Sequence, residues 1–155
     1  KLATTRGITS DIVTNGTMVD ITGDVPRVVE YVETGRVYLD GSVLIGALDG
    51  VVRERIKVAL NGHVLATVIL DEDDQILGDA WAEISGLPRV GKSGAALGGQ
   101  IEAELTEFVE NAHPKMRADD DKLEEAIKRL TRQVAMEEVG KKPEVTVVIS
   151  RLTTE

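Results

Sequence analysis

The strongest constraint on the fold is the segment 63–70, HVLATVIL, which is almost continuously apolar. Its length and its β-branched residues are typical of a central strand that is buried on both faces of a sheet. Such a strand needs neighbouring strands to pair with and helices to cover it. The sequence after residue 50 contains candidates for both.

Two amphipathic helices are predicted downstream of this strand. Apolar residues recur at three- and four-residue spacing over 97–112 and again over 123–134, as they do in helices with one face on a core. Pro114 ends the first helix, and the acidic run 119–121 favours the start of the second. With a short helix at 51–60 and strands near 80–84 and 145–149, these elements predict an α+β fold. In this small two-layer domain, a three-stranded sheet is covered by two main helices.

Residues 1–50 follow a different pattern. Residues 1–7 resemble the last turn of a helix, and Asn15-Gly16 between β-forming residues predicts a hairpin with strands at 11–14 and 17–22. Closely spaced glycines over 23–50 predict a linker with extended pieces at 27–32 and 35–39. A lone hairpin is marginal in water and needs a surface to lie on. We therefore divide the chain into 1–22 (helix end and β-hairpin), 23–50 (linker) and 51–155 (α+β domain).

The chain has few of the residues that hydrolytic chemistry uses. It has no cysteine and only two histidines, His63 and His113, which we expect at a strand edge and at a helix C-terminus. Neither has a second histidine at metal-ligand spacing, and no nucleophile motif is present. The segment 86–93, GLPRVGKS, has the G-x-x-x-x-G-K-S spacing of a phosphate loop, but residues 84–86 are a weak fit to the strand that should precede such a loop, so we expect a flexible connector here. The sequence predicts no catalytic residue, no metal ligand and no cofactor in this chain.

The charge distribution limits contact with nucleic acid. The net charge is −9; residues 1–114 carry 9 Lys and Arg against 18 Asp and Glu, whereas residues 115–155 carry 9 of each. An acidic surface repels RNA, so we expect RNA contact to be weak and confined to the C-terminal third. The candidate cations for contact with RNA or a partner are Lys128, Arg132, Lys141 and Lys142. Alternatively, these cations simply favour a helix C-terminus.

The sequence also indicates the cellular location. No apolar run approaches the roughly 20 residues that a membrane-spanning helix needs. The absence of cysteine agrees with a reducing compartment, so we expect a cytoplasmic protein without a membrane contact.

Four segments resemble the C-terminal portion of ribonuclease J, a family of bacterial nucleases of the metallo-β-lactamase/β-CASP group. They are GITSDIVTNGTMVDIT (7–22), GRVYLDG (35–41), RERIKVALNGHVLATVILD (53–71) and GKKPEVTVVISRL (140–152). The resemblance implies that 1–22 is the end of the metallo-β-lactamase domain and that 51–155 is the C-terminal domain. It also implies that the full enzyme degrades RNA with two zinc ions, held by a His-x-His-x-Asp-His motif that this chain lacks.

We therefore expect a non-catalytic C-terminal region of a zinc-dependent ribonuclease, involved in RNA processing and degradation. Its expected partners are the rest of the parent nuclease and a second copy of itself, because the family's C-terminal domain is associated with assembly. The region would support assembly, dimerisation or RNA positioning. The alternative is an α+β module, unrelated to RNA, that binds a small molecule or a protein. A free-standing enzyme would need a site that the sequence does not contain.

Overall fold

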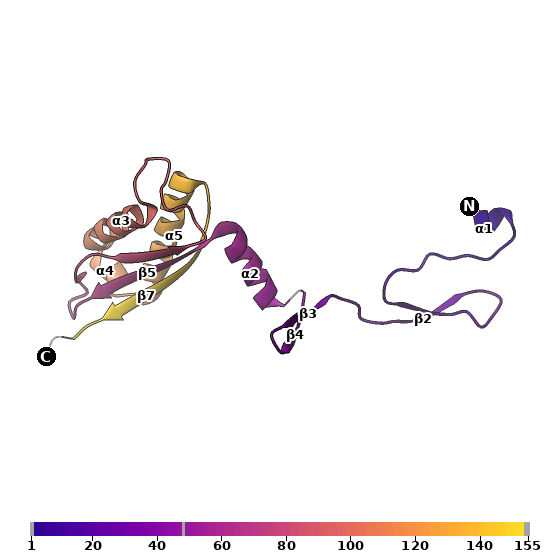
Figure 1. Cartoon of the computed structure of the whole chain (residues 1–155). Helices are drawn as coiled ribbons and strands as arrows, with labels where there is room; N and C mark the ends of the chain where they lie inside the picture. The colour runs from indigo at the N-terminus through magenta and orange to yellow at the C-terminus, as the bar shows by residue number, and fades with distance from the viewer. Residues whose placement is uncertain (1, 48, 154–155) are drawn as a thin grey trace. The chain divides into compact units, whose positions relative to one another are not determined.

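The computed structural model describes residues 2–47 and 49–153 (Figure 1). The chain divides into two compact units, Lys1–Val52 and Arg53–Glu155. The first unit contains a short helix and four strands, which pair as two separate hairpins. Their bounds are α1 (Leu2–Thr5), β1 (Thr17–Asp20), β2 (Arg27–Tyr31), β3 (Val37–Asp40) and β4 (Val43–Gly46).

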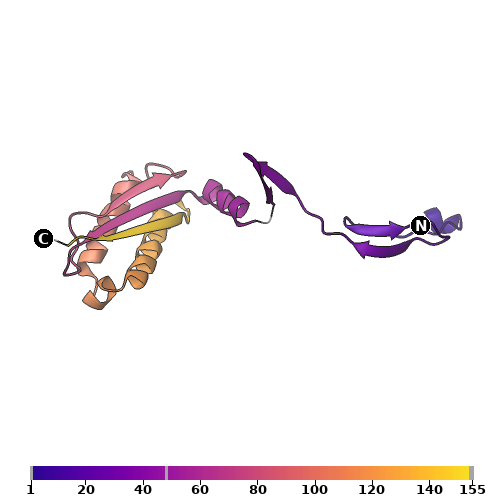
Figure 2. The same ribbon diagram turned by 90° about the horizontal axis from the view of Figure 1, so that it is seen from below.

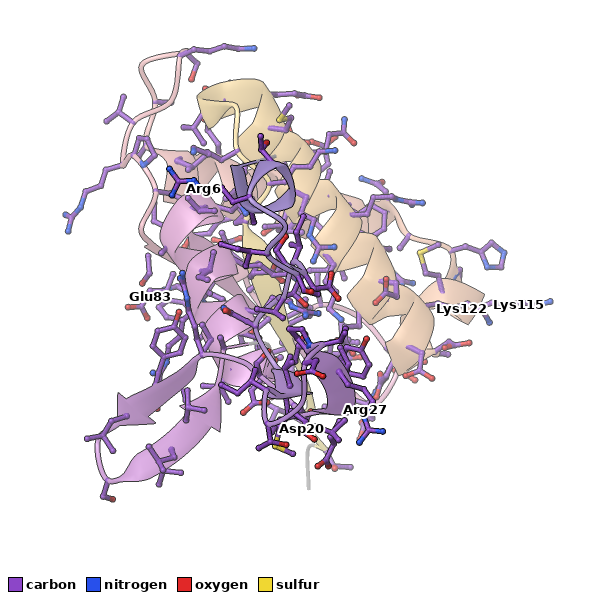
Figure 3. All side chains as sticks on the ribbon, turned by 90° about the vertical axis from the view of Figure 1, so that its right-hand side faces the viewer. Arg6, Asp20, Arg27, Glu83, Lys115 and Lys122 are labelled. Carbon is purple, nitrogen blue, oxygen red and sulfur yellow. The ribbon has the colours of Figure 1, made fainter. Side chains whose placement is uncertain are left out.

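The first hairpin does not form where the sequence predicts it. β1 lies within the predicted strand 17–22, but residues 11–14 form no strand, and β1 pairs with β2 instead. Asn15 and Gly16 do lie in a turn, which the Thr17 N–H closes by donating to the Thr14 carbonyl at 3.0 Å. The turn thus leads into β1 rather than joining it to the preceding residues. Asp20 and Arg27 face each other at the other end, 3.8 Å apart (Figure 3).

The second hairpin joins two strands in the predicted linker. β3 and β4 pair in unbroken antiparallel register from Val37↔Gly46 to Asp40↔Val43. The two-residue turn between them begins at Gly41, whose φ of +62° is a conformation that favours glycine. The extended pieces predicted at 27–32 and 35–39 form β2 and β3, and β4 is a strand that was not predicted.

The second unit has the predicted α+β architecture. Its sheet has the order β6-β5-β7, with β5 (His63–Leu70) antiparallel to β6 (Trp81–Ser85) and parallel to β7 (Glu144–Arg151). Helices α3 (Leu97–Asn111) and α5 (Asp120–Val139) lie on one side of this sheet, α3 near β6 and α5 near β7 (Figures 1 and 2). The three-stranded sheet and the two main helices are confirmed.

The core lies between the sheet and the two main helices. Alternate residues of β5 are fully buried, and they meet the apolar stripes of both helices. The expectation that β5 is buried on both faces is wrong, because helices cover one face only. The largest fully buried apolar side chains are Leu70, Leu97, Ile101, Leu105, Leu123, Ile127, Val64, Val68, Val109 and Pro143.

Two further helices complete this part of the chain. α2 (Gly50–Asn61) precedes β5 and has no buried residue, although its apolar stripe was predicted. α4 (Pro114–Arg117) was not predicted. His113 does not end α3 as expected; it is the N-cap of α4, where its Nδ1 accepts from the Lys115 N–H at 3.2 Å.

Local signals fix the ends of α5. The Asp119 carboxylate accepts from the Lys122 N–H at 3.2 Å and caps the first turn, and the left-handed Gly140 ends the helix. The start of α5 is fastened to the end of β7, because Arg151 Nη2 lies 2.7 Å from Asp120 Oδ1. Arg151 also pairs with Asp74 in the turn that follows β5.

Candidate functional site

The structure divides the four cations that the sequence predicts as one patch. Lys128 Nζ lies 2.5 Å from Glu124 Oε1 and 3.2 Å from Glu125 Oε1. Both hydrogen bonds raise the pKa of Lys128, and the one to Glu124 has the larger effect. Lys141 Nζ donates to the Leu60 carbonyl at 3.0 Å, near the end of α2. Both ammonium groups are thus used within the domain.

The other two predicted cations lie together. Arg132 and Lys142 both line a groove of about 800 Å³ along α5. Arg132 Nε donates to the Pro143 carbonyl at 3.3 Å, so its guanidinium group spans from α5 towards the start of β7. The predicted patch is therefore two cations in a groove and two cations held elsewhere.

The groove contains further residues that sequence reasoning missed. Two more cations, Lys122 and Arg129, and two methionines, Met116 and Met136, line it. Lys122 lies at the start of α5, where its ammonium group pairs with the Asp119 carboxylate (Figure 3). Glu125 and Glu137 also line the groove, so its lining carries four positive and two negative side chains in a chain of net charge −9. A sequence signal for these groove residues does exist. Lys122, Glu125 and Arg129 follow at three- and four-residue spacing, which places them on the face of α5 opposite the core.

The two edges of the sheet differ. Along β6, side chains of α3 close the edge: Thr106 Oγ1 accepts from the Ala80 N–H at 2.9 Å and Glu102 Oε1 accepts from the Ala82 N–H at 3.0 Å. These N–H groups would otherwise point outwards from the sheet. The β6 edge thus has no free donors at these two positions.

The β7 edge is open. The Glu144 N–H donates to the Gly62 carbonyl at 3.1 Å and the Leu152 N–H to the Leu70 carbonyl at 2.8 Å, both towards β5. Because successive N–H groups of a strand point to opposite sides, those of Val145, Val147 and Ile149 point away from β5. Within the described part of the chain, these three donors meet no acceptor. An edge of this kind can pair with another strand.

The sheet face opposite the helices is also uncovered within the second unit (Figure 2). It carries three large apolar side chains, Ile69, Val148 and Trp81, which are 36%, 41% and 50% exposed. His63 contributes a polar contact, with Nε2 2.9 Å from Thr146 Oγ1. No Lys or Arg side chain lies on the central strand of this face, so it fits an apolar partner better than RNA.

The glycine-rich loop 86–99 is fastened to the end of α5. Glu138 Oε2 accepts from Ser93 Oγ at 2.7 Å and from the Ser93 N–H at 3.1 Å, and these bonds lower the pKa of Glu138. A side chain at Gly91 would overlap the Glu138 carboxylate. The loop was predicted as a flexible connector, but its glycine allows a close contact with α5.

The described residues form neither a metal site nor a membrane-spanning helix. Over residues 2–47 and 49–153, no group of three or more His, Cys, Asp or Glu side chains is arranged to hold a metal ion, so these residues do not fit the zinc centre that the resemblance implies for the full enzyme. No helix in the same ranges is long and apolar enough to cross a bilayer.

Comparison with known proteins agrees with this architecture. A family model described as "Ribonuclease J C-terminal domain" matches residues 50–152. Ribonuclease J of Sinorhizobium meliloti (strain Sm2011 / Rm2011 / 2011) is 33% identical over 139 residues, which cover 89% of this chain and 24% of that protein. The chain thus spans about a quarter of the length of this relative. The match over more than half of the chain shows that it belongs to the ribonuclease J family and contains that family's C-terminal domain.

Proposed function

We propose that this chain is a non-catalytic C-terminal region of a ribonuclease J-type RNA-degrading hydrolase. Its relative carries the name ribonuclease J, and the matched region is about a quarter of that protein. In this proposal, zinc and the catalytic residues belong to the metallo-β-lactamase and β-CASP portion of the parent enzyme. The present chain supports assembly of that enzyme and positions it for RNA.

The observation that carries the proposal is the exposed apolar surface of the first unit. Among the residues of this unit whose side chains are described, none is buried. The second hairpin alone exposes Val37 (61%), Leu39 (71%) and Leu44 (71%). Because a hairpin is marginal without an apolar surface to cover it, we infer that the rest of the parent nuclease covers this unit.

Comparing the chain with its full-length parent tests this proposal. We expect the chain with added zinc to leave a 5′-labelled RNA intact, and the parent to degrade it. In limited proteolysis, sites in residues 8–47 should be cut quickly in the chain and slowly in the parent. RNA cleavage by the chain alone would contradict its non-catalytic role, and equal proteolysis in both proteins would contradict the covering.

We also propose that the second unit supports assembly by self-association. The open β7 edge and the uncovered face with Trp81 support this role, since exposed apolar patches and free strand edges commonly mark interfaces. Sedimentation velocity from about 10 µM to about 1 mM should show a monomer–dimer equilibrium, because these concentrations bracket a weak interface. A strict monomer over this range would contradict self-association.

A second role, weak RNA contact, is favoured by the groove along α5. Its four cations lie in a chain that is otherwise acidic. If the groove contacts RNA phosphates, Arg129→Glu with Lys142→Glu should abolish the binding of a single-stranded RNA at low salt, while Arg89→Glu, outside the groove, should not. Binding that the groove variants leave unchanged would contradict this role.

A further inference from the structure

We propose that two copies of this domain join through their β7 edges, which pair antiparallel to form one continuous sheet. This inference rests on the proposed role in assembly and names the surface that performs it. The occupant of the edge is a second copy of the same strand. In such a pair the same surface is used by both copies, as in most homodimers.

The first argument is that, among the described residues, the β7 edge offers more free donors than the β6 edge. Glu102 and Thr106 use the outward N–H groups of the β6 edge, whereas those of Val145, Val147 and Ile149 on β7 stay free. Added strands gain their affinity from such main-chain donors and acceptors. A strand that docks on this sheet therefore finds a longer row of free donors on β7 than on β6.

The second argument is the composition of β7. From Val145 to Ser150 the strand contains neither a proline nor a charged residue, which are the usual means of protecting a free edge. Its eight residues pair with β5 without a bulge, from His63↔Glu144 to Leu70↔Arg151. Val147 and Ile149 pack against the core, so the edge is held straight and ready to pair.

The third argument is the charge pattern beside the edge. Glu124, Lys128 and Arg132 follow at four-residue spacing and so lie on one stripe of α5. This stripe is on the β7 side, because Arg132 reaches the Pro143 carbonyl just before β7. The stripe has a negative end, Glu124, which also pairs with Lys128 of its own copy, and a positive end, Arg132, so it is complementary to a second copy in the opposite direction.

The geometry brings the complementary ends together. Arg151 and Asp120 are paired, so the end of β7 lies level with the start of α5. The middle of β7 lies about 12 Å back along the strand from Arg151. About eight residues of helix cover the same distance, so counting from Asp120 along α5 leads to Lys128. An antiparallel pair centred at the middle of β7 therefore places Glu124 of each copy opposite Arg132 of the other. This self-complementarity is the reason for assigning the edge to a second copy rather than to a foreign strand.

Amide hydrogen exchange of the full chain tests the seam directly. We expect the amides of Val145, Val147 and Ile149 to exchange rapidly at about 10 µM and to become protected at about 1 mM, as the dimer forms. The amides of Thr146 and Val148 point to β5 and should be protected at both concentrations. A dimer whose outward amides stay unprotected would overturn the seam and leave self-association intact; a strict monomer would overturn both.

Charge reversal gives an independent test. Glu124→Arg and Arg132→Glu should each raise the dimer dissociation constant about tenfold, because twofold symmetry counts each lost pair twice. The double variant restores opposite charges across the seam and should recover most of the affinity. Glu104→Arg, on the exposed surface of α3, is the matched control and should leave the constant unchanged. Without recovery in the double variant, or with an equal effect of Glu104→Arg, the proposed register is wrong.

Discussion

The two units of this chain use hydrogen bonds in the same way but differ in burial. Each contains paired strands, although the register of β1 and β2 shifts between Met18 and Val19. In the second unit, Leu70, Leu105 and Ile127 are fully buried. In the first, no described side chain is buried.

This difference shows what local signals can and cannot do. Turn geometry and β-propensity are sufficient to specify a hairpin, but net stability comes largely from apolar burial. The second unit buries its apolar side chains and pairs its strands within its own sequence, except at the β7 edge and on one face of the sheet. The first unit has its stabilising surface in another part of the parent protein, on the proposal made above.

Separating the units should give the largest effect. Residues 53–155 alone should unfold cooperatively in urea with nearly the stability of the full chain, because they contain the whole core. Residues 1–52 alone should show no cooperative transition by circular dichroism. A cooperative transition in residues 1–52 would mean that the hairpins have a source of stability that burial does not explain.

A truncation in the core should have the next largest effect. Ile127 is fully buried, so Ile127→Ala should lower the free energy of unfolding by about 2–5 kcal/mol. The matched change in the first unit is Val43→Ala, at a side chain that is 59% exposed, and it should change stability by less than about 0.5 kcal/mol. Similar losses from both changes in urea denaturation would remove the contrast between the units.

Substituting two threonines with valine should change the free energy of unfolding in opposite directions. Thr131 is fully buried, and its hydroxyl has no hydrogen-bond partner among the described residues. Thr131→Val should therefore raise the free energy of unfolding by about 1 kcal/mol, since an unsatisfied hydroxyl is costly to bury. Thr106→Val removes the acceptor of the Ala80 N–H and should lower it by about 1–2 kcal/mol. The pair is compared by chemical denaturation, and a loss of stability in both variants would contradict this account of Thr131.

The smallest effect concerns pH. In the folded state, hydrogen bonds from Ser93, together with the positive charge of Lys92, hold the pKa of the Glu138 carboxyl group below its ordinary value of 4.5. This latch, the pair of hydrogen bonds from Ser93 to Glu138, therefore stabilises the fold above the ordinary pKa, and its contribution is lost as the pH falls through the lower folded pKa. Glu138→Gln should flatten the acid limb of the stability curve, whereas Glu107→Gln, on the surface of α3, should not. An unchanged acid limb in Glu138→Gln would show that the latch contributes nothing.

Much of the second unit could be predicted because its elements carry periodic patterns. The spacing of Leu97, Ile101 and Leu105 located α3, and the apolar run of β5 located the central strand. The open face of β5 was missed, because a continuous apolar run does not show whether helices cover one side of a sheet or both. The sequence also gave no sign of α4, a single turn that is too short for a periodic pattern.

Other features depend on contacts between distant residues. The Asn15-Gly16 turn was recognised, but β1 pairs with β2 across a second turn, where Asp20 is the register partner of Arg27. Arg117 is 7% exposed and donates to the Glu110 carbonyl at 3.1 Å, although charged residues are normally predicted at the surface. For the candidate site, clustering of charge indicated Arg132 and Lys142, but the partners of Lys128 and Lys141 were set by side-chain geometry.

Residue-resolved hydrogen exchange of the intact chain tests the central claim most directly. Amides of β5, α3 and α5 should exchange only through global unfolding of the second unit, and amides of β1 to β4 should exchange close to the rate of an unfolded peptide. Strong protection of β1 to β4 in this chain would contradict the claim that the first unit needs a surface from the rest of the nuclease.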